Sequence, residues 1–471
     1  MKQTRNAHGK AIPSLCPVKD GHQFVLYGDS CSGVPKAPAE TTLSALNKVI
    51  GRLSRTPEFC IFAGDEIIGL TGDERSLLSQ WQHWLDVEMR WIPANSVPLY
   101  NVPGNHTVYD RMSERVYQEV HKRLPRNGPS DQMGLSYSVR RGDLLLIFIN
   151  TMSLEMGGEG HVETVWLEAT LERNRDAKWC FVTGHHPAFP VNGYVGEYQR
   201  TIGTEHVERL WSLLVKHGVS AYICSHILAY DVQIHDGVLQ ITTGGAGTPH
   251  LMPSEHEFHH VLQACIDENG LRYQVLDVDG VSRTKLSWPL SLPPSQNWTT
   301  LDHPVGHPQF EKIDDASAPD LMAYRLRGRT ATEAVAGQQT LCALSCGKDS
   351  HMPLWIGLTG KNKRLVVKLQ PWRHRSPHTW LGPELGTDRP FDIQVALHGD
   401  MGPGGILWRS DDTASWQSLT GASPWGPDVL FSMLRTQGDF RGCSVDGAPF
   451  GGTDFMATGY AQLNRKQTDM L

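Results

Sequence analysis

The sequence predicts a layered α/β domain, with helices flanking buried sheets, followed by a smaller all-β domain. Three observations carry this prediction. The chain has 471 residues, more than one hydrophobic core usually supports, so about two or three domains are expected. Short apolar runs alternate with amphipathic stretches from residue 24 to about 290, which is typical of α/β layers. Beyond about residue 320 helical periodicity fades, and short strand candidates with many glycines replace it.

Six apolar runs in the first part have the character of buried strands that end in polar loops. Between them lie segments with apolar residues at helical spacing. One runs from Leu43 to Leu53, after the candidate caps Thr41 and Thr42. Another begins at Val207 and stops at a glycine, residue 218. The strand candidates read FVLYGD, FCIFAGD, PLYNVPGN, LLLIFIN, WCFVTGHH and SAYICSH.

Composition then divides the chain. We expect an N-terminal extension over 1–23, the α/β domain over 24–290, a linker over 291–319 and an all-β sandwich over 320–471. The linker is rich in proline and polar residues. In the last segment, LMAYRLRG, RLVVKLQPW and FDIQVALHG are strand candidates. The stretch FDIQVALHGDMGPGGILWRSDD resembles a lectin-like jelly roll of the laminin-G kind.

The second domain holds six of the 14 tryptophans, and two interpretations of them stay open. Exposed indoles would suit stacking on sugars, whereas buried indoles are the commoner arrangement in a β-sandwich, because each buries a large area. The domain could also cover an active-site mouth or mediate self-association. The six are Trp355, Trp372, Trp380, Trp408, Trp416 and Trp425.

Charge and cysteine usage bound the partners and the compartment. Net charge is -7 without a basic block, so nucleic acid and anionic membranes are not expected partners. No apolar run approaches the roughly 20 residues of a bilayer span. The first residues lack the apolar stretch of a secretory signal. Cys60, Cys180 and Cys224 lie inside apolar runs, which favours buried free thiols and the reducing cytosol. A secreted form trimmed of its leader is the alternative.

Polar residues stand directly after the strand candidates of the first domain, and they carry the functional information. Open α/β sheets place ligand sites just past the carboxyl ends of their strands. Oxygen and imidazole donors arriving there from separate strands suit a borderline divalent ion such as zinc, manganese or iron. Each pair alone is a common turn, but five in order predict a metal site. The five groups are Gly28-Asp29, Gly64-Asp65, Gly104-Asn105-His106, Gly184-His185-His186 and Ser225-His226.

These groups resemble the calcineurin-like metallophosphoesterases, in particular the purple acid phosphatase branch. That family carries blocks of the form GDxG, GDxxY, GNH followed by an acid, a GHxP-like block and GHxH. The corresponding blocks here read GDSCSGVP, GDEII, GNHT, GHHP and SHILAYD. The resemblance covers about residues 24–290. It implies an αββα sandwich and metal-dependent hydrolysis of a phosphate mono- or diester, on a small-molecule or glycan-linked substrate.

The resemblance implies that the second metal position is intact. Asp65 would bridge the two positions, and Asn105, His185 and His226 would complete the second. The first position would use Asp29 and Asp65, but Ile68 and Leu228 stand where the family has a tyrosine and a histidine. We therefore expect one tightly held ion and a first position that is weak or absent, since ligand number governs retention.

Four further side chains have roles implied by the resemblance. Cys31 stands where another branch has a ligand histidine, so its thiolate could bind metal; packing in a loop is the alternative. His106 would stabilise charge on the leaving oxygen, although Thr107 replaces the acid that usually follows it. Asp29 would serve as base for the attacking water if it is freed from metal binding. His186 would face the phosphate, with surface or core packing as the alternative.

Loops beyond the strand ends are expected to border the pocket. NTMSLEMGGEGH follows one strand, and FPVNGYVGEYQR supplies Tyr194 and Tyr198 as candidate contacts to a leaving group; ordinary packing would also explain these tyrosines.

Two other functions must be weighed. FVLYGDSCSG is similar to the first block of GDSL serine hydrolases, with Ser30 as nucleophile, but the GxND block of that family is missing. Alternatively, the altered ligands could mark a non-catalytic binding protein on the phosphoesterase scaffold, since fold does not determine function.

Overall fold

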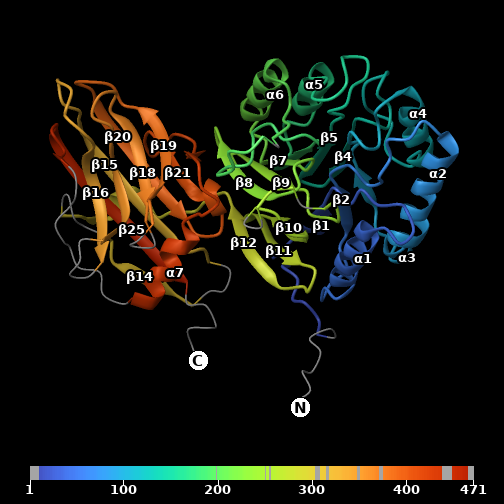
Figure 1. Cartoon of the computed structure of the whole chain (residues 1–471), viewed down its shortest axis with the longest axis horizontal. Coiled ribbons are helices and arrows are strands. Elements are labelled where there is room, and N and C mark those ends of the chain that lie inside the picture. The colour runs from blue at the N-terminus through green and yellow to red at the C-terminus, as the bar shows by residue number, and fades with distance from the viewer. Residues whose placement is uncertain are drawn as a thin grey trace, which may run out of the picture. The chain divides into compact units, whose positions relative to one another are not determined.

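The structure is a computed structural model that describes residues 10–197, 199–249, 251–253, 256–302, 308–314, 318–346, 351–370, 375–437 and 448–464. The chain divides into two compact units (Figure 1). The first takes in the chain as far as Val191, together with 196–231 and 238–288. The second comprises 192–195, 232–237 and the chain from Pro289 onward.

The first unit contains two sheets. In one, the order is β12-β11-β10-β1-β2-β3, and its three N-terminal strands run parallel. In the other, the order is β4-β5-β6-β7-β9-β8, with β5, β6, β7 and β9 parallel. The first sheet is built from β1 (His22–Tyr27), β2 (Phe59–Phe62), β3 (Leu99–Asn101), β10 (His260–Asp267), β11 (Gly270–Asp277) and β12 (Ser282–Trp288). The second is built from β4 (Tyr137–Arg141), β5 (Leu144–Phe148), β6 (Trp179–Thr183), β7 (Ala221–Cys224), β8 (Tyr230–His235) and β9 (Val238–Thr243).

Helices cover the outer face of each sheet. The predicted helix at residue 43 begins earlier, at Pro38, because proline suits the first helical turn. The helix predicted from Val207 begins at Thr204 and ends at Lys216, just before Gly218 at φ 61°. The helices are α1 (Pro38–Gly51), α2 (Glu74–His83), the π-helical turn η2 (Trp84–Glu88), α3 (Trp91–Ala94), α4 (Arg111–Val120), α5 (Val165–Arg173) and α6 (Thr204–Lys216).

Strand alternation explains the layering. Val25 and Tyr27 of β1 share one apolar core with α1, α2 and η2, while Phe24 points to the other face and its ring lies 6.1 Å from that of Phe181 in β6. Cys180 of β6 belongs to a second core with α5 and α6. The parallel strands β1 and β6 are therefore apolar on both faces, as buried parallel strands require. The order is helices, sheet, sheet, helices, so the predicted αββα fold is confirmed.

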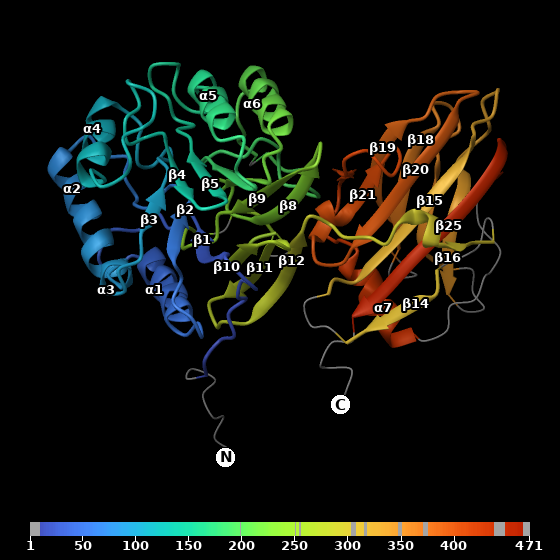
Figure 2. The same cartoon turned by 180° about the vertical axis from the view of Figure 1, so that it is seen from behind.

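The second unit is mainly β, as predicted. One sheet has the order β13-β25-β15-β20-β21-β22, with β14 paired to β25, and the other has the order β23-β19-β18-β17-β16-β24 (Figure 2). Both contribute to one core, in which Leu326, Ile356, Val367 and Val395 lie together. Their strands are β13 (Thr299–Thr300), β14 (Phe310–Ile313), β15 (Leu321–Arg329), β16 (Gln339–Cys346), β17 (His351–Leu358), β18 (Arg364–Leu369), β19 (His378–Glu384), β20 (Pro390–His398), β21 (Ile406–Arg409), β22 (Gln417–Ser418), β23 (Thr420–Gly421), β24 (Ala448–Pro449) and β25 (Thr453–Asn464).

Two features of this unit differ from the sequence expectation. A helix, α7 (Asp428–Gln437), forms where none was predicted. Leu430, Phe431 and Leu434 pack its apolar side into the core, but an apolar stripe this short does not stand out in the sequence. Strands β13 and β14 lie inside the segment expected to be a linker. Buried Leu301, next to β13, joins the core.

The tryptophans of the second unit fit the core interpretation better than the sugar-stacking one. Trp355, Trp380 and Trp416 are buried, and Trp408 and Trp425 are partly exposed. Trp372 lies outside the described residues.

Two other expectations bear on the described part of the chain. No helix in it combines the length and apolar character that crossing a bilayer requires. Cys60, Cys180 and Cys224 are buried free thiols.

Candidate metal centre

Four predicted ligands of the second metal position meet at one edge of the paired sheets. Asp65 follows β2 and Asn105 follows β3 in the first sheet, whereas His185 follows β6 and His226 follows β7 in the second. All four come just past the carboxyl ends of parallel strands. The packing of the two sheets therefore brings residues more than 100 positions apart to one place.

The donor atoms surround Nε2 of His185. Asp65 Oδ2 lies 3.1 Å from it, His226 Nδ1 lies 3.1 Å from it and Asn105 Oδ1 lies 3.2 Å from it. Ligands around a tetrahedral zinc ion stand about 3.4 Å apart, given bonds of about 2.1 Å. Two imidazoles, a carboxylate and an amide oxygen are thus of the right type and nearly the right spacing for a borderline divalent ion.

The imidazole of His185 is oriented for this role. Its Nδ1 lies 2.9 Å from the backbone carbonyl oxygen of Ala63, which can only accept, so Nδ1 carries a proton and Nε2 faces the other donors. The hydroxyl of Ser225 also donates a hydrogen bond to the carbonyl oxygen of Ala63, at 2.6 Å. Burial alone would lower the pKa of His185, but Asp65 raises it to about 9. A bound ion would take the place of the Nε2 proton.

Several residues at this candidate metal centre have strained backbone conformations. Asp29, Asp65 and His226 have φ values of 59°, 54° and 62°, in the left-handed region that costs about 1–3 kcal/mol for a residue with a side chain. Gly64 has φ 95°, and a Cβ there would lie 2.5 Å from Nδ1 of His185. Sharp turns directly after the strands are what direct these side chains toward one another.

Comparison with known proteins shows what part of this unit is similar to. Residues 22–230 match the family described as "Calcineurin-like phosphoesterase". That match spans just under half of the chain. The chain is also similar to tartrate-resistant acid phosphatase type 5 from rabbit (Oryctolagus cuniculus), at 26% identity over 229 residues. That alignment covers 43% of this chain and 66% of the rabbit protein. The human protein is 25% identical over 239 residues, covering 46% of this chain and 70% of the human one.

The chain therefore spans just under two thirds of the length of the rabbit relative. Among solved structures, a purple acid phosphatase from yellow lupin (Lupinus luteus) seeds aligns with TM-score 0.42 and 16% identity, over 60% of this chain and 59% of that one. A dimetal phosphatase from Danio rerio aligns with TM-score 0.39 and 15% identity, over 58% of this chain and 100% of that one.

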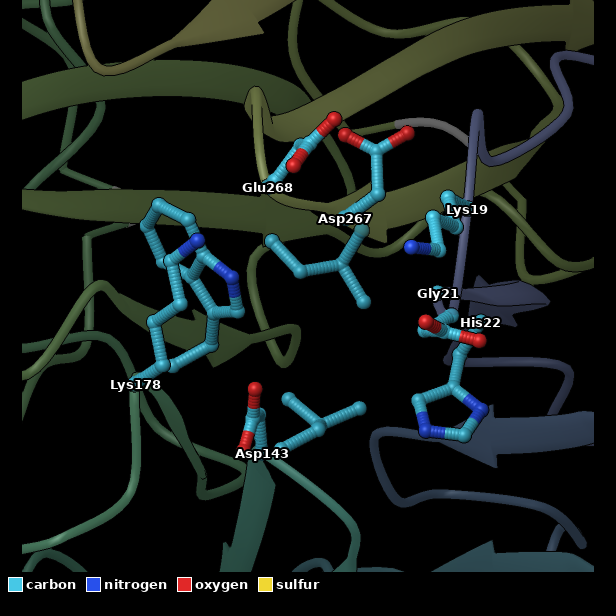
Figure 3. Close-up of a pocket in the computed structure, with 11 residues that line it drawn as sticks. Lys19, Gly21, His22, Asp143, Lys178, Asp267 and Glu268 are labelled. Carbon is cyan, nitrogen blue, oxygen red and sulfur yellow. The ribbon is translucent and has the colours of Figure 1, made fainter.

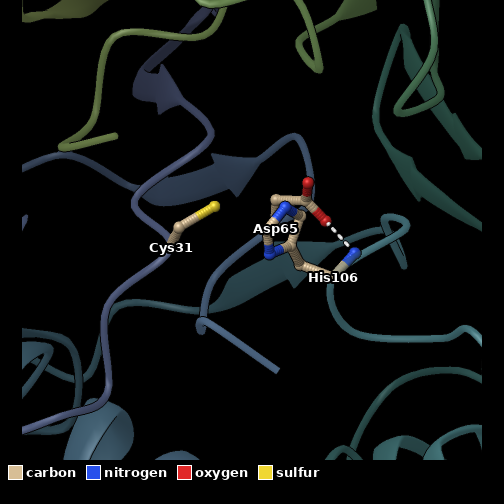
Figure 4. A group of neighbouring side chains, drawn as sticks. All are labelled: Cys31, Asp65 and His106. Atoms are coloured by element: carbon tan, nitrogen blue, oxygen red, sulfur yellow. Dashed lines mark hydrogen bonds between the residues drawn. The ribbon is translucent and has the colours of Figure 1, made fainter. Parts of the chain in front are cut away.

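Cys31 and His106 lie beside the bridging candidate Asp65. Figure 4 shows the Cys31 thiol directed toward the Asp65 carboxylate, and donor atoms of the three residues lie within 4.8 Å of one another. The backbone N–H of His106 donates to Asp65 Oδ1 at 2.9 Å. Burial raises the pKa of Cys31 well above its ordinary value, so the thiol is protonated without an ion. Metal binding by Cys31 remains a prediction.

The orientation of His106 has an unexpected source. Its Nδ1 lies 2.7 Å from the carbonyl oxygen of Ile68, so Nδ1–H donates and Nε2 is the nitrogen left for a substrate. Thr107, which replaces the usual acid, is buried and closes the turn instead. Its hydroxyl accepts from the N–H of Gly104 at 2.8 Å. A backbone carbonyl thus orients the imidazole, a task for which the sequence resemblance implied an acid at position 107.

Asp29 is placed differently from the other predicted ligands. Its Oδ2 accepts the backbone N–H of His226 at 2.6 Å. Burial raises the pKa of Asp29 to about 6. In the clusters of metal donors found among the described residues, Asp29 is not a member. This carboxylate positions His226, and its roles as ligand and base remain predictions.

The weakness of the first metal position stays a prediction. Ile68 is 38% exposed and Leu228 is 3% exposed, and both are aliphatic. Of the predicted substrate contacts, Tyr194 is assigned to the second unit, and Tyr198 lies outside the described residues. His186 is fully buried, and burial lowers its pKa to about 4.

Sequence reasoning missed Glu159, which lies on the loop expected to border the pocket. Its Oε1 is 3.5 Å from Nε2 of His186 and 3.7 Å from Nε2 of His226. Arg200 contacts the same oxygen at 3.1 Å. Gly157, Gly158 and Gly160 lie around it, all with positive φ, and this group of glycines is a sequence signal of an unusual loop.

Ser30 does not have the setting of a nucleophile. It is fully buried, its hydroxyl donates to the carbonyl oxygen of Glu66 at 2.6 Å and it accepts from Nε1 of Trp84 at 3.2 Å. A serine nucleophile needs a base and access to substrate. Both hydrogen bonds instead tie the β1 loop to the core.

The structure also contains a small cavity of about 190 Å³. Lys19, Asp143 and Lys178 are among the residues that line it (Figure 3). It is lined by His22, Leu144 and Trp179, which begin β1, β5 and β6. His185 follows the opposite, carboxyl end of β6, and the other three candidate ligands follow the carboxyl ends of β2, β3 and β7, which run parallel to β1 or β6. This cavity is therefore at the wrong edge of the sheets to serve the candidate centre.

Proposed function

We propose that the chain is a metal-dependent phosphoric ester hydrolase, with one divalent ion held by Asp65, Asn105, His185 and His226. The observation that carries the proposal is the convergence of three donor atoms within 3.1–3.2 Å of Nε2 of His185. When bound, such an ion polarises the phosphoryl group and lowers the pKa of a coordinated water. The similarity of residues 22–230 to a phosphoesterase family supports phosphate esters as the substrate class.

The protein's own residues then have distinct tasks. His106 is held by the Ile68 carbonyl so that Nε2 can donate to, or stabilise, the leaving oxygen. Asp29, with a pKa near 6, would accept a proton from the attacking water if one of its oxygens reaches it. Both phosphate monoesters and phosphate diesters are compatible with this arrangement. Loops at the mouth of the site, such as the one that carries Glu159, would determine which of the two is the substrate.

The test is turnover of p-nitrophenyl phosphate, bis(p-nitrophenyl) phosphate and p-nitrophenyl sulfate by the zinc-, manganese- or iron-loaded protein. We expect chelator-sensitive turnover of a phosphate ester and its loss in Asn105→Ala. If Asp29→Asn left turnover unchanged while His226→Ala abolished it, Asp29 would not be the base. Absence of turnover with any loaded metal would refute the hydrolase.

A non-catalytic binding protein is the second candidate, and one observation favours it. Ile68, Leu228 and Thr107 replace two ligands and an acid that the family uses in catalysis. In that case the loaded protein would bind phosphate or phosphate esters without turning them over. Binding by calorimetry, combined with absent turnover, would establish this alternative.

A further inference from the structure

A second cluster of metal donors lies beside the candidate centre and is formed by Glu159, His186 and His226. Oε1 of Glu159 lies 3.5 Å from Nε2 of His186 and 3.7 Å from Nε2 of His226. The two imidazole centroids are 4.2 Å apart. These separations are too long for good hydrogen bonds but match the roughly 3.4 Å between ligands that share a zinc ion.

The two imidazole nitrogens of this cluster are buried without a hydrogen-bond partner. Nε2 of His186 and Nε2 of His226 are both in this state, in side chains that are 0% and 1% exposed. A buried unsatisfied nitrogen costs about 1–3 kcal/mol, so two facing one carboxylate call for a ligand. Thr151 fixes the ring of His186, because its hydroxyl lies 2.8 Å from Nδ1.

His226 belongs to both clusters through opposite nitrogens. Nδ1 lies 3.1 Å from Nε2 of His185, within the centre already described. Nε2 faces Glu159 and His186. A single imidazole ring therefore lies between two sets of donors, each containing another histidine and a carboxylate.

We propose that Glu159, His186 and Nε2 of His226 bind a second divalent transition-metal ion. The ring of His226 would bridge the two ions as an imidazolate, its N–H proton passing to solvent when the second ion binds. Two histidines and one carboxylate form an open three-ligand set of the kind found in catalytic zinc sites, with room for water. This position differs from the one weakened by Ile68 and Leu228, and the aliphatic residues there supply no donor. The chain would thus recover a second ion at a different place.

Charge at the loop is compatible with an ion. Arg200 lies 3.1 Å from Oε1 of Glu159 and balances the carboxylate when no metal is present. The Arg200 side chain is 49% exposed, so it can turn into solvent when a cation takes its place. Glu159 is itself 37% exposed, which leaves a route for the ion to enter.

The experiment is cobalt and zinc loading of the metal-stripped full chain, followed by dialysis and elemental analysis. We expect two equivalents in the unaltered protein and one in both Glu159→Gln and His186→Ala. His226→Ala should weaken both positions, because it removes a ligand from each. His217→Ala is the matched control: its Nε2 is also buried and unpaired, but it is in none of the donor clusters of the described residues, and it should keep two equivalents.

Two results would overturn the proposal. One is a single equivalent in the unaltered protein, and the other is two equivalents retained in both Glu159→Gln and His186→Ala. Glu159 lies on a partly exposed loop, so Glu159→Gln remains informative should His186→Ala fail to fold. Because stoichiometry is measured without substrate, a protein that binds two ions but hydrolyses nothing would refute the proposed hydrolase and leave this inference standing.

Discussion

Replacement of Gly104 by alanine tests whether the Asp65 carboxylate must stay where the structure places it. A Cβ on Gly104 would lie 2.1 Å from Asp65 Oδ1 and 2.8 Å from the Asp65 backbone nitrogen. Real Cβ contacts essentially never fall under 3.0 Å, so this separation has to grow by about 0.9 Å, through movement of the Asp65 carboxylate or of the backbone of the turn at residue 104. The same oxygen, Oδ1 of Asp65, also accepts a hydrogen bond from the backbone N–H of His106 at 2.9 Å, which restricts its movement.

That displacement exceeds what metal coordination tolerates. Ligand distances must hold to about 0.2 Å, and a misplacement of about 1 Å can cost about 100-fold in rate. We expect Gly104→Ala to bind zinc at least about 10- to 100-fold more weakly, as loss of a supporting contact does. Turnover of the loaded variant should fall by about 100-fold.

Calorimetric titration of the metal-stripped protein measures the affinity, and circular dichroism reports whether the variant is folded. Gly72→Ala is the matched control, because a Cβ there meets nothing within 4 Å. A folded Gly104→Ala variant that binds zinc as tightly as the unaltered protein would refute the placement of Asp65 at the centre.

Three further predictions use other parts of the domain. Removing the ion with a chelator should lower Tm, because an ion at 100 times its Kd stabilises the fold by about 2.7 kcal/mol; an unchanged melting curve would contradict a folded-state site. His121, whose pKa burial lowers to about 3 from 6.5, makes the fold less stable as pH falls through that window, since only the unfolded chain takes up the proton. Between pH 6 and pH 4 the free energy of unfolding should therefore decrease less steeply in His121→Leu than in the unaltered protein, by up to about 1.4 kcal/mol per pH unit. Urea denaturation at each pH measures this slope, and equal slopes in the two proteins would contradict the prediction. Ser30→Ala should lower the free energy of unfolding by about 1–3 kcal/mol, because Trp84 and the Glu66 carbonyl each lose a hydrogen-bond partner. Turnover by the folded variant should persist. Loss of turnover in a variant that still folds would instead favour a serine nucleophile.

Much of the fold was predictable because its signal is local. Apolar runs such as FCIFAGD report a buried strand and the turn that ends it, and such strands pack as parallel layers with helices outside. Helix α7 and the strands within 291–319 were not predictable, because short elements take their stability from the core they join, as Leu430 and Leu301 do.

For the candidate centre, the sequence by itself determined the donor types, their order and the loss of donors at Ile68 and Leu228. Each of these depends only on which residue comes directly after a strand or within its loop. Only the tertiary structure decided that the Ala63 carbonyl orients His185, that the Ile68 carbonyl orients His106, and that Glu159 faces the free side of His226. Backbone carbonyls are common to every residue, and a loop carboxylate has no periodicity, so neither leaves a pattern in the sequence. Their positions depend on how distant segments pack.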